Sequence, residues 1–208
     1  MFSAIDMSYI TNKTLRKKFE AALSRTIRFI RKNPFFIISE SDLKCYLYSE
    51  LLKEPAFRKK FSVEGFEIPL LHTEYNFVGR FGRGLRDIAI LNCNQIGKND
   101  NDYIDNQIVL IGCELKLKWY RSLENIRFHL DSDASTFKPP KNKSSKDSVE
   151  KFGYVFFIHY ARKKSDDTKV SKIVSHIKKM RLQNPSVKYY FLEISEDNKR
   201  AELIYPIK

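Results

Sequence analysis

Apolar residues recur at spacings of three and four in several stretches of the chain, which is the pattern of a helix with one buried face. The longest stretch, residues 14–32, predicts an amphipathic helix that Pro34 closes. A second helix is predicted to begin at Ser39, because Asp42 three positions later completes a capping box. Residues 122–130 and 169–182 predict two further helices. The apolar positions of the first two helices are Leu15, Phe19, Leu23, Ile27 and Ile30, and then Leu43, Leu47 and Leu51.

Strands are predicted where short apolar runs are bounded by turn residues. These runs are residues 68–77, 87–91, 108–119, 152–160, 187–194 and 201–207. The order of elements predicts an α/β fold with a mixed central β-sheet flanked by helices and a strand pair at the C-terminal end. We expect residues 1–36 to form a basic helix packed on the core and residues 37–208 to form the main domain. Within that domain, residues 131–150 are rich in Lys, Ser and Pro and predict a mobile basic loop.

The charge balance indicates a class of partner in addition to the fold. The 208 residues carry a formal net charge of +13, and 42% of them are hydrophobic, which suffices for a sizeable core. A basic protein of this size attracts polyanions, of which nucleic acid is the commonest. The alternative is a general lysine richness with no bound partner, and the basic residues of the first helix are also explained as its solvated face.

Cysteine and histidine residues add little chemistry. Three cysteines form no Cys-x-x-Cys pair, and four histidines have no metal-ligand spacing, so we expect neither a disulfide framework nor a zinc site. The first residues lack the apolar segment of a signal peptide, and no stretch is long enough to span a membrane. The sequence therefore predicts a soluble, intracellular, cytoplasmic protein with no membrane partner.

The candidate chemistry lies on two neighbouring predicted strands. Asp87 opens an apolar strand, and Glu114 and Lys116 lie within the next one. Side chains alternate along a strand, so Glu114 and Lys116 share one face. A charged pair inside an apolar run should either be paired or hold a ligand, because burying an unpaired charge is costly. Carboxylates that hold a divalent cation beside a group that serves water are the elements of phosphodiester hydrolysis.

The acid-x-Lys tripeptide is weak evidence alone, since it begins at four positions: Asp42, Glu114, Asp167 and Asp197. Only the copy at Glu114 follows an extended apolar run and a second acid-bearing strand. Asp87 with Glu114-Leu115-Lys116 resembles the motif of the PD-(D/E)XK nuclease superfamily, which includes restriction endonucleases and Holliday junction resolvases. Residues 33–52 also resemble the leading helix of many members, opened by Glu40, and residues 72–91 resemble the first hairpin. The resemblance covers residues 33–120 and implies a restriction endonuclease-like core with the order αβββαβ.

The resemblance further implies a magnesium-dependent nuclease, with manganese as an alternative ion. Asp87, Glu114 and the carbonyl of Leu115 would bind the metal, with Glu40 as an additional acid that reaches in from its helix. Lys116 would orient or activate water and stabilise charge that develops on the phosphate. One departure from the motif is Arg86, which stands where the superfamily name has a proline. Glu50 and Glu74 remain alternatives to Glu40.

Basic residues near the motif are candidate nucleic-acid contacts, because arginine suits phosphate oxygens and glycine lets a backbone approach a polyanion. These residues are Arg80, Arg83, Arg86 and Lys118. The leading hypothesis is a nuclease that acts on nucleic acid, with DNA favoured over RNA, and the resemblance admits a homodimer. The alternatives are a non-catalytic nucleic-acid-binding protein with a nuclease-like fold and a basic structural protein of a ribonucleoprotein. The sequence leaves the substrate form, the specificity and the choice between endonuclease and exonuclease open.

Overall fold

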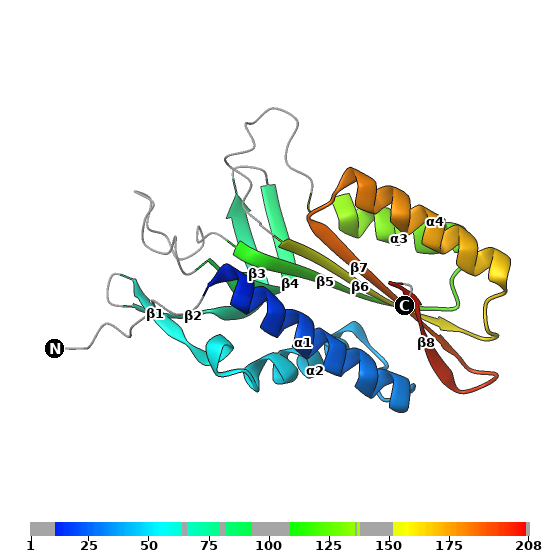
Figure 1. Ribbon diagram of the computed structural model, residues 1–208, viewed down its shortest axis with the longest axis horizontal. Helices are drawn as coiled ribbons and strands as arrows, with labels where there is room; N and C mark the ends of the chain where they lie inside the picture. The colour runs from blue at the N-terminus through cyan, green and yellow to red at the C-terminus, as the bar shows by residue number, and fades with distance from the viewer. Residues whose placement is uncertain are drawn as a thin grey trace.

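The computed structural model describes residues 11–63, 66–79, 82–92, 109–135, 137 and 152–206. Within these residues the protein is an α/β fold in three layers, with a mixed sheet of six strands between two pairs of helices. Figure 1 shows α1 and α2 on one side of the sheet and α3 and α4 on the other. The predicted fold class, a mixed sheet flanked by helices, is therefore confirmed.

The first two helices form where the sequence pattern predicts them. Helix α1 (Asn12–Lys32) is capped by Thr11, whose side chain accepts a hydrogen bond from the Thr14 backbone N–H. Helix α2 (Glu40–Leu52) begins with the predicted capping box between Ser39 and Asp42. The apolar stripes named from the sequence are buried on both helices. Each helix therefore has one face committed to the core and one left for polar contacts.

The six strands of the main sheet lie in their sequence order, β3-β4-β5-β6-β7-β8. The pairs β3–β4, β4–β5 and β7–β8 are antiparallel, whereas β5–β6 and β6–β7 are parallel. The parallel connections run through α3 and α4, as parallel neighbours require a crossover. The strands are β3 (Leu71–Gly79), β4 (Gly82–Leu91), β5 (Val109–Trp119), β6 (Phe152–Ala161), β7 (Val187–Ser195) and β8 (Arg200–Tyr205).

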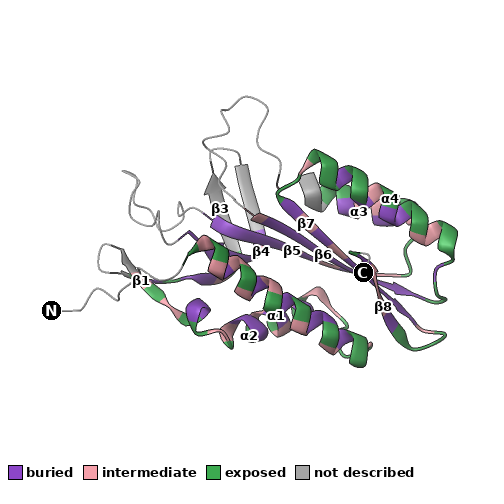
Figure 2. Ribbon diagram, viewed as in Figure 1, coloured by how far each residue is buried: buried purple, intermediate pink, exposed green. Residues whose placement is uncertain are grey.

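The two faces of β6 separate the core into two clusters. Tyr154, Phe156 and Ile158 pack in the cluster with α1 and α2. Val155 and Phe157 pack in the cluster with α3 (Leu123–Ser135) and α4 (Asp167–Gln183). The central strands are buried along most of their length in Figure 2. A continuous apolar strand covered by helices on both faces is what a central parallel strand requires.

The structure corrects three element predictions. Residues 68–77 do not form one strand: they divide into β2 (Phe66–Pro69), which pairs with β1 (Lys60–Val63) in a separate hairpin, and β3. The division follows Pro69, and the Leu70 N–H bonds to the Lys59 carbonyl at 2.9 Å. The strand expected over residues 87–91 begins at residue 82, and the hairpin that the resemblance implied, β3–β4, is present.

Helix α3 is also longer than predicted. It continues to Ser135, five residues into the segment expected to be a mobile loop. Asp131 lies in this extension, and its Oδ1 is 3.0 Å from Nε2 of His176 on α4, so the helix has a tertiary partner here. Residues 136 and 138–150, the rest of that segment apart from residue 137, lie outside the described residues.

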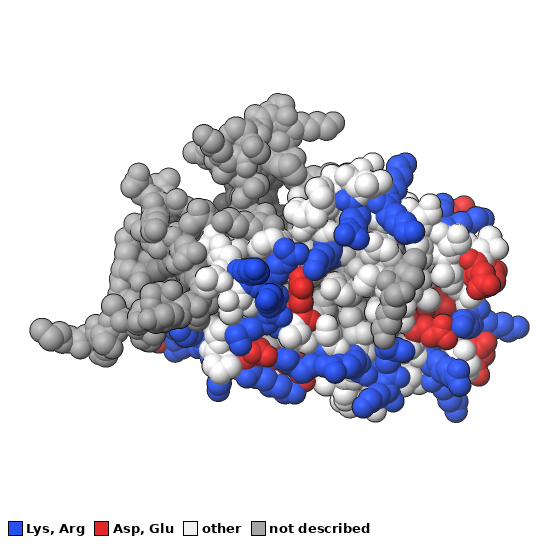
Figure 3. Space-filling view, viewed as in Figure 1, with Lys and Arg blue, Asp and Glu red and all other residues white. Residues whose placement is uncertain are grey.

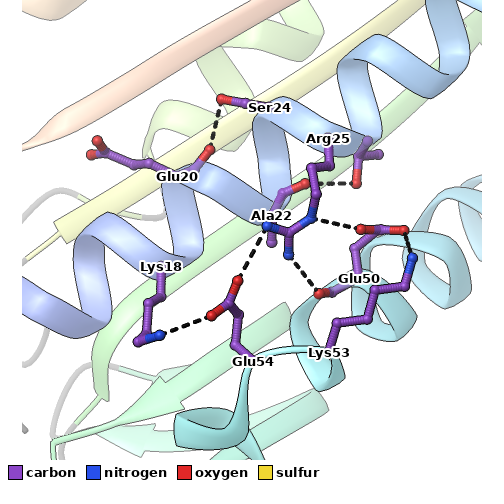
Figure 4. A network of polar contacts seen from close by, with 9 residues as sticks. Lys18, Glu20, Ala22, Ser24, Arg25, Glu50, Lys53 and Glu54 are labelled. Atoms are coloured by element: carbon purple, nitrogen blue, oxygen red, sulfur yellow. Dashed lines mark hydrogen bonds and ion pairs between the residues drawn. The ribbon is translucent and has the colours of Figure 1, made fainter.

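The helices α1 and α2 are joined by a network of ion pairs. Arg25 Nε donates to Glu50 Oε2 at 2.8 Å, and Arg25 NH1 lies 3.1 Å from Glu54 Oε1. Lys18 also contacts Glu54, at 2.8 Å. Figure 4 shows Arg25 between the two carboxylates. The basic N-terminal helix is thus packed on the core by its apolar stripe and bound to α2 by its charges.

No helix in the described part of the chain combines the length and the apolarity that a membrane crossing requires.

Candidate functional site

The candidate site lies where β4 stops pairing with β5. The residue pair at this end of the ladder is Ile88 with Cys113. Asp87 and Glu114 are the next residues beyond this pair, each on its own strand. Beyond it, two backbone N–H groups of β5 donate to carboxylates instead of to a strand. Leu115 N donates to Asp87 Oδ2 at 2.7 Å, and Leu117 N donates to Glu40 Oε1 at 3.3 Å. Asp87 and Glu40 therefore cap the open edge of β5.

We call Glu40, Asp87, Glu114 and Lys116 the β5-edge site. Helix α2 brings Glu40 there because the capping box fixes where the helix begins, with Glu40 as its first residue. The structure therefore joins the predicted leading acid to the predicted motif strand, 77 residues apart in sequence. A backbone N–H left without a strand partner needs another acceptor, and these carboxylates supply it.

Lys44 is a residue that sequence reasoning missed. Its Nζ lies 3.3 Å from Asp87 Oδ1 and also contacts Glu74 Oε1. Glu74 is exposed and has a positive φ of 49°, and it is skipped in the β3–β4 register at the position opposite Asp87. The signal for Lys44 was its position four residues after Glu40, which places both on one side of α2.

A partner of Glu114 is an arginine. Its Oε1 accepts a hydrogen bond from Arg86 NH1 at 2.9 Å. Arg86 is only 3% exposed, and its guanidinium lies 4.4 Å from the ring centre of Phe137. This corrects the expectation that Arg86 contacts nucleic acid: the residue before Asp87 points into the protein and holds Glu114.

The predicted alternation along β5 is confirmed. Residues 113, 115 and 117 are buried, whereas Glu114, Lys116 and Lys118 are half-buried. Lys116 Nζ lies 3.9 Å from Glu40 Oε2, and Lys118 Nζ lies 3.6 Å from Glu40 Oε1. Glu40 thus receives two cations of β5 in addition to the Leu117 N–H. Lys118 lies at the site edge, where the sequence placed a nucleic-acid contact.

His129 on α3 adds a titratable group beside these lysines. Burial lowers its pKa, and so do the nearby charges of Lys118, Lys116 and Arg121. The imidazole is therefore neutral at neutral pH. The Glu40 carboxylate acts in the opposite direction, to raise the pKa of His129, but does not outweigh burial and these cations.

The three alternative acids are separated by their positions. Glu40 and Glu74 both reach the β5-edge site, directly or through Lys44. Glu50 is 4% exposed and is held by Arg25 and Lys53 at the α1–α2 contact. Burial acts to raise the pKa of Glu50, but these two cations hold it below its ordinary range. Glu50 therefore belongs to the network that joins the helices.

Two predicted arginine contacts have no described side chain. Arg80 lies outside the described residues, and Arg83 lies within β4, opposite residue 78 of β3. Trp119 is a packing residue: its ring stacks on Tyr160 at 3.9 Å between centroids, and its Nε1 donates to the Ile38 carbonyl.

Asp87 and Glu114 are carboxylates on adjacent strands, and carboxylate oxygen is a ligand that hard divalent cations prefer. In a strand the N–H and C=O of one residue point to the same side, so the Leu115 carbonyl also faces Asp87 and the open edge. Among the described residues, no three His, Cys, Asp or Glu side chains converge closely enough to hold a metal by themselves. Asp87, Glu114 and the Leu115 carbonyl, which the sequence named as metal ligands, are oxygen donors of the kind that Mg²⁺ prefers.

Comparison with protein-family models, with curated proteins and with solved structures gave no significant match.

Proposed function

We propose that this protein is a metal-dependent nuclease that hydrolyses phosphodiester bonds, with DNA as the favoured substrate. The observation that carries the proposal is the open edge of β5. There, Asp87 and Glu40 lie on consecutive outward N–H groups of the strand that also carries Glu114 and Lys116. Asp87, Glu40 and Lys116, from three elements, lie at one strand edge, where a phosphodiester could approach the backbone.

The order of elements supports a restriction endonuclease-like core. From α2 to β6 the chain runs helix, the separate β1–β2 hairpin, the three sheet strands β3 to β5, helix, strand, which is the order that the resemblance implied with one hairpin inserted. The antiparallel pairs β3–β4 and β4–β5 are followed by the parallel pair β5–β6. The motif residues occupy the second and third strands of this core, as the resemblance requires.

The residues have separate roles in this proposal. Asp87 and Glu114 bind the cation, and the Leu115 N–H keeps the Asp87 carboxylate in place. A bound Mg²⁺ would supply positive charge beside the phosphate and a water of lowered pKa. Lys116 holds the attacking water or the developing charge, and Glu40 orients Lys116 across 3.9 Å. Lys118 and the electropositive end of β5 attract the phosphate.

Two ion pairs favour a second candidate function, a non-catalytic nucleic-acid-binding protein with this fold. Arg86 neutralises Glu114, and Lys44 neutralises Asp87, so both acids are satisfied without a metal. In a nuclease, the cation would take the place of Arg86 and Lys44 at these oxygens. In a binding protein, the pairs would simply persist.

A cleavage assay separates the two candidates. Purified protein is incubated with linear, circular and branched DNA and with RNA, in Mg²⁺, in Mn²⁺ and in chelator. The nuclease predicts products that depend on the divalent ion and are absent for Asp87→Asn. The binding protein predicts salt-sensitive affinity that is independent of divalent ions, and no product with any substrate.

A further inference from the structure

A basic groove lies at the C-terminal end of α1, apart from the β5-edge site. It has a volume of about 560 Å³ and is formed by the last two turns of α1 and the β7–β8 turn. Five of its eight lining residues are cationic. The full lining is Arg28, Arg31, Lys32, Pro34, Lys199, Arg200, Ala201 and Glu202. Figure 3 shows Lys and Arg side chains gathered over α1 on this side of the molecule.

The cations of the groove are available for a ligand. Arg28, Arg31 and Lys32 are exposed and share one side of α1 through spacings of three and four. Lys199 and Arg200 are exposed on a different element, so the helix dipole at the end of α1 does not explain their position. The acid of the groove, Glu202, is paired with Lys164 at 2.9 Å. Its charge is therefore not used to neutralise the five cations.

Exposed apolar side chains follow Pro34, a lining residue of the groove, in the chain. The connection between α1 and α2 carries Phe35, Phe36 and Ile38, which are 40%, 62% and 59% exposed. Phe36 stands edge-on against Phe29, with their centroids 4.9 Å apart. Tyr120, which is 44% exposed, follows β5 directly. Three large apolar side chains within four residues of surface connection are a cost unless something covers them.

This connection links the groove to the β5-edge site. Pro34 lines the groove, and Glu40, six residues later, caps the edge of β5. Six residues span at most about 20 Å. Ile38 is tied to β5 by the bond from Trp119 Nε1 to its carbonyl, and Pro34 is tied to β6 by Tyr160. The path from groove to site is therefore short and anchored at both ends.

We propose that the groove and this connection bind a single-stranded segment of nucleic acid, with phosphates in the groove and bases stacked on Phe36 and its neighbours. A cationic groove with exposed aromatic rings is the arrangement used for single strands, because every base has a π-face. A duplex hides its bases, so it offers nothing to the aromatic side chains. One consequence of this inference rests on the proposed function. If the protein cleaves nucleic acid at the β5-edge site, the strand that leaves that site would be unpaired.

The test measures binding of the full chain in chelator, where no cleavage occurs. The probes are a labelled oligodeoxythymidylate and a labelled duplex of the same length, followed by fluorescence anisotropy across a salt series. Phe36→Ala should weaken single-strand binding on the order of tenfold, as expected for one lost stacked base. Arg31→Glu should weaken it on the order of tenfold and lower the salt slope by about 0.7 per lost phosphate contact.

Matched controls come from the opposite helix layer. Phe128→Ala removes an aromatic side chain that is 68% exposed on α3, and Lys178→Glu reverses an exposed charge on α4. Both should bind the single strand like the wild type. Circular dichroism of all four variants checks that each is folded, which these exposed positions favour.

The outcomes separate this inference from the proposed function. Single-strand affinity unchanged in Phe36→Ala and Arg31→Glu would overturn the inference, whatever the cleavage assay shows. If Arg31→Glu weakens duplex binding as much as single-strand binding, and Phe36→Ala weakens neither, the proposal of single-strand binding is overturned. That result would indicate duplex binding. If both groove variants weaken single-strand binding but no substrate is cleaved, the inference is supported and the proposed nuclease function is refuted.

Discussion

Two groups of carboxylates in this protein have the same residue types but different partners. At the α1–α2 contact, Glu50 and Glu54 accept from side-chain cations at 2.8–3.1 Å, with Arg25 shared between them. At the β5 edge, Asp87 and Glu40 accept from backbone N–H groups, and their lysine partners are farther away, at 3.3–3.9 Å. The first group joins two helices, and the second occupies the place of a missing strand.

The difference indicates which group can bind a ligand. A carboxylate has about four acceptor positions. Those of Glu50 are directed to cations and buried, and exchanging them would leave Arg25 with Glu54 as its remaining acid. Asp87 and Glu40 have single backbone bonds, loosely held lysines and access to solvent at a strand edge. A carboxylate that replaces a strand can still accept a cation or orient water, whereas one that joins two helices cannot do so without loosening the fold.

The largest expected effect comes from the motif itself. Glu114→Ala and Lys116→Ala should each lower the cleavage rate by about 10³-fold or more, because each removes a group that acts on the transition state. Glu114→Ala should also weaken divalent-ion binding, measured by calorimetry, since a hard cation loses an anionic ligand. Lys116→Ala should leave ion binding equal or stronger, because a nearby positive charge is gone.

The matched control is Glu54→Gln, a carboxylate of the helix contact that should cleave like the wild type. Wild-type cleavage by either motif variant would refute the assignment of the β5-edge site. Equal loss of ion binding in both variants would instead indicate a structural pair whose loss disturbs the sheet.

The next effect is on stability and belongs to the helix contact. Arg25→Ala leaves the buried Glu50 with Lys53 as its remaining cation. We expect a loss of about 2–3 kcal/mol in the free energy of unfolding, measured by urea denaturation. Cleavage per folded molecule should not change. A loss below about 0.5 kcal/mol would show that this contact is no more than a surface pair.

The pH dependence of the same variant sharpens the comparison. Burial acts to raise the pKa of Glu50, but Lys53 and Arg25 hold it below its ordinary value of 4.5, and Lys18 and Arg25 lower that of Glu54. A lowered folded-state pKa stabilises the protein above pH 4.5, and that stability is lost as the pH falls through the folded pKa. The stability gap between wild type and Arg25→Ala should therefore narrow by about 1 kcal/mol below pH 4.5. Thermal melts of both proteins across this pH range measure the difference in stability. A difference that does not change with pH would show that the ion pairs of Arg25 are not its cause.

The smallest effect is expected from Glu40. Glu40→Gln keeps an acceptor for the Leu117 N–H but removes the charge that faces Lys116 and Lys118. Stability should change by less than about 0.5 kcal/mol, as for an exposed pair. Cleavage should fall about fivefold, equivalent to about 1 kcal/mol, through the misplaced Lys116. Glu40→Ala should be more impaired than Glu40→Gln, and wild-type cleavage by both variants would remove Glu40 from the site.

The sequence by itself determined the elements whose signals are local. Apolar spacing located α1 and α4, the Ser39–Asp42 box located the start of α2, and the apolar runs located the central strands β5 to β7. Strict alternation along β5 was enough to place Glu114 and Lys116 on one face, because the strand period is two. These features depend on neighbours a few residues away, which is why the pattern of the chain predicts them.

Only the tertiary structure decided what the charged residues contact. Glu40, Lys44 and Asp87 meet at β5 because β4 pairs with β5 only from Ile88 onward, and no local pattern records where a neighbouring strand starts pairing. Arg86, which the sequence placed at the surface as a nucleic-acid contact, is buried and bonded to Glu114 instead. The extension of α3 lies likewise against a distant partner, His176 of α4. A carboxylate next to a strand can cap it, bind a ligand or face water, and the choice is made by the free backbone groups and cations that the fold brings within reach.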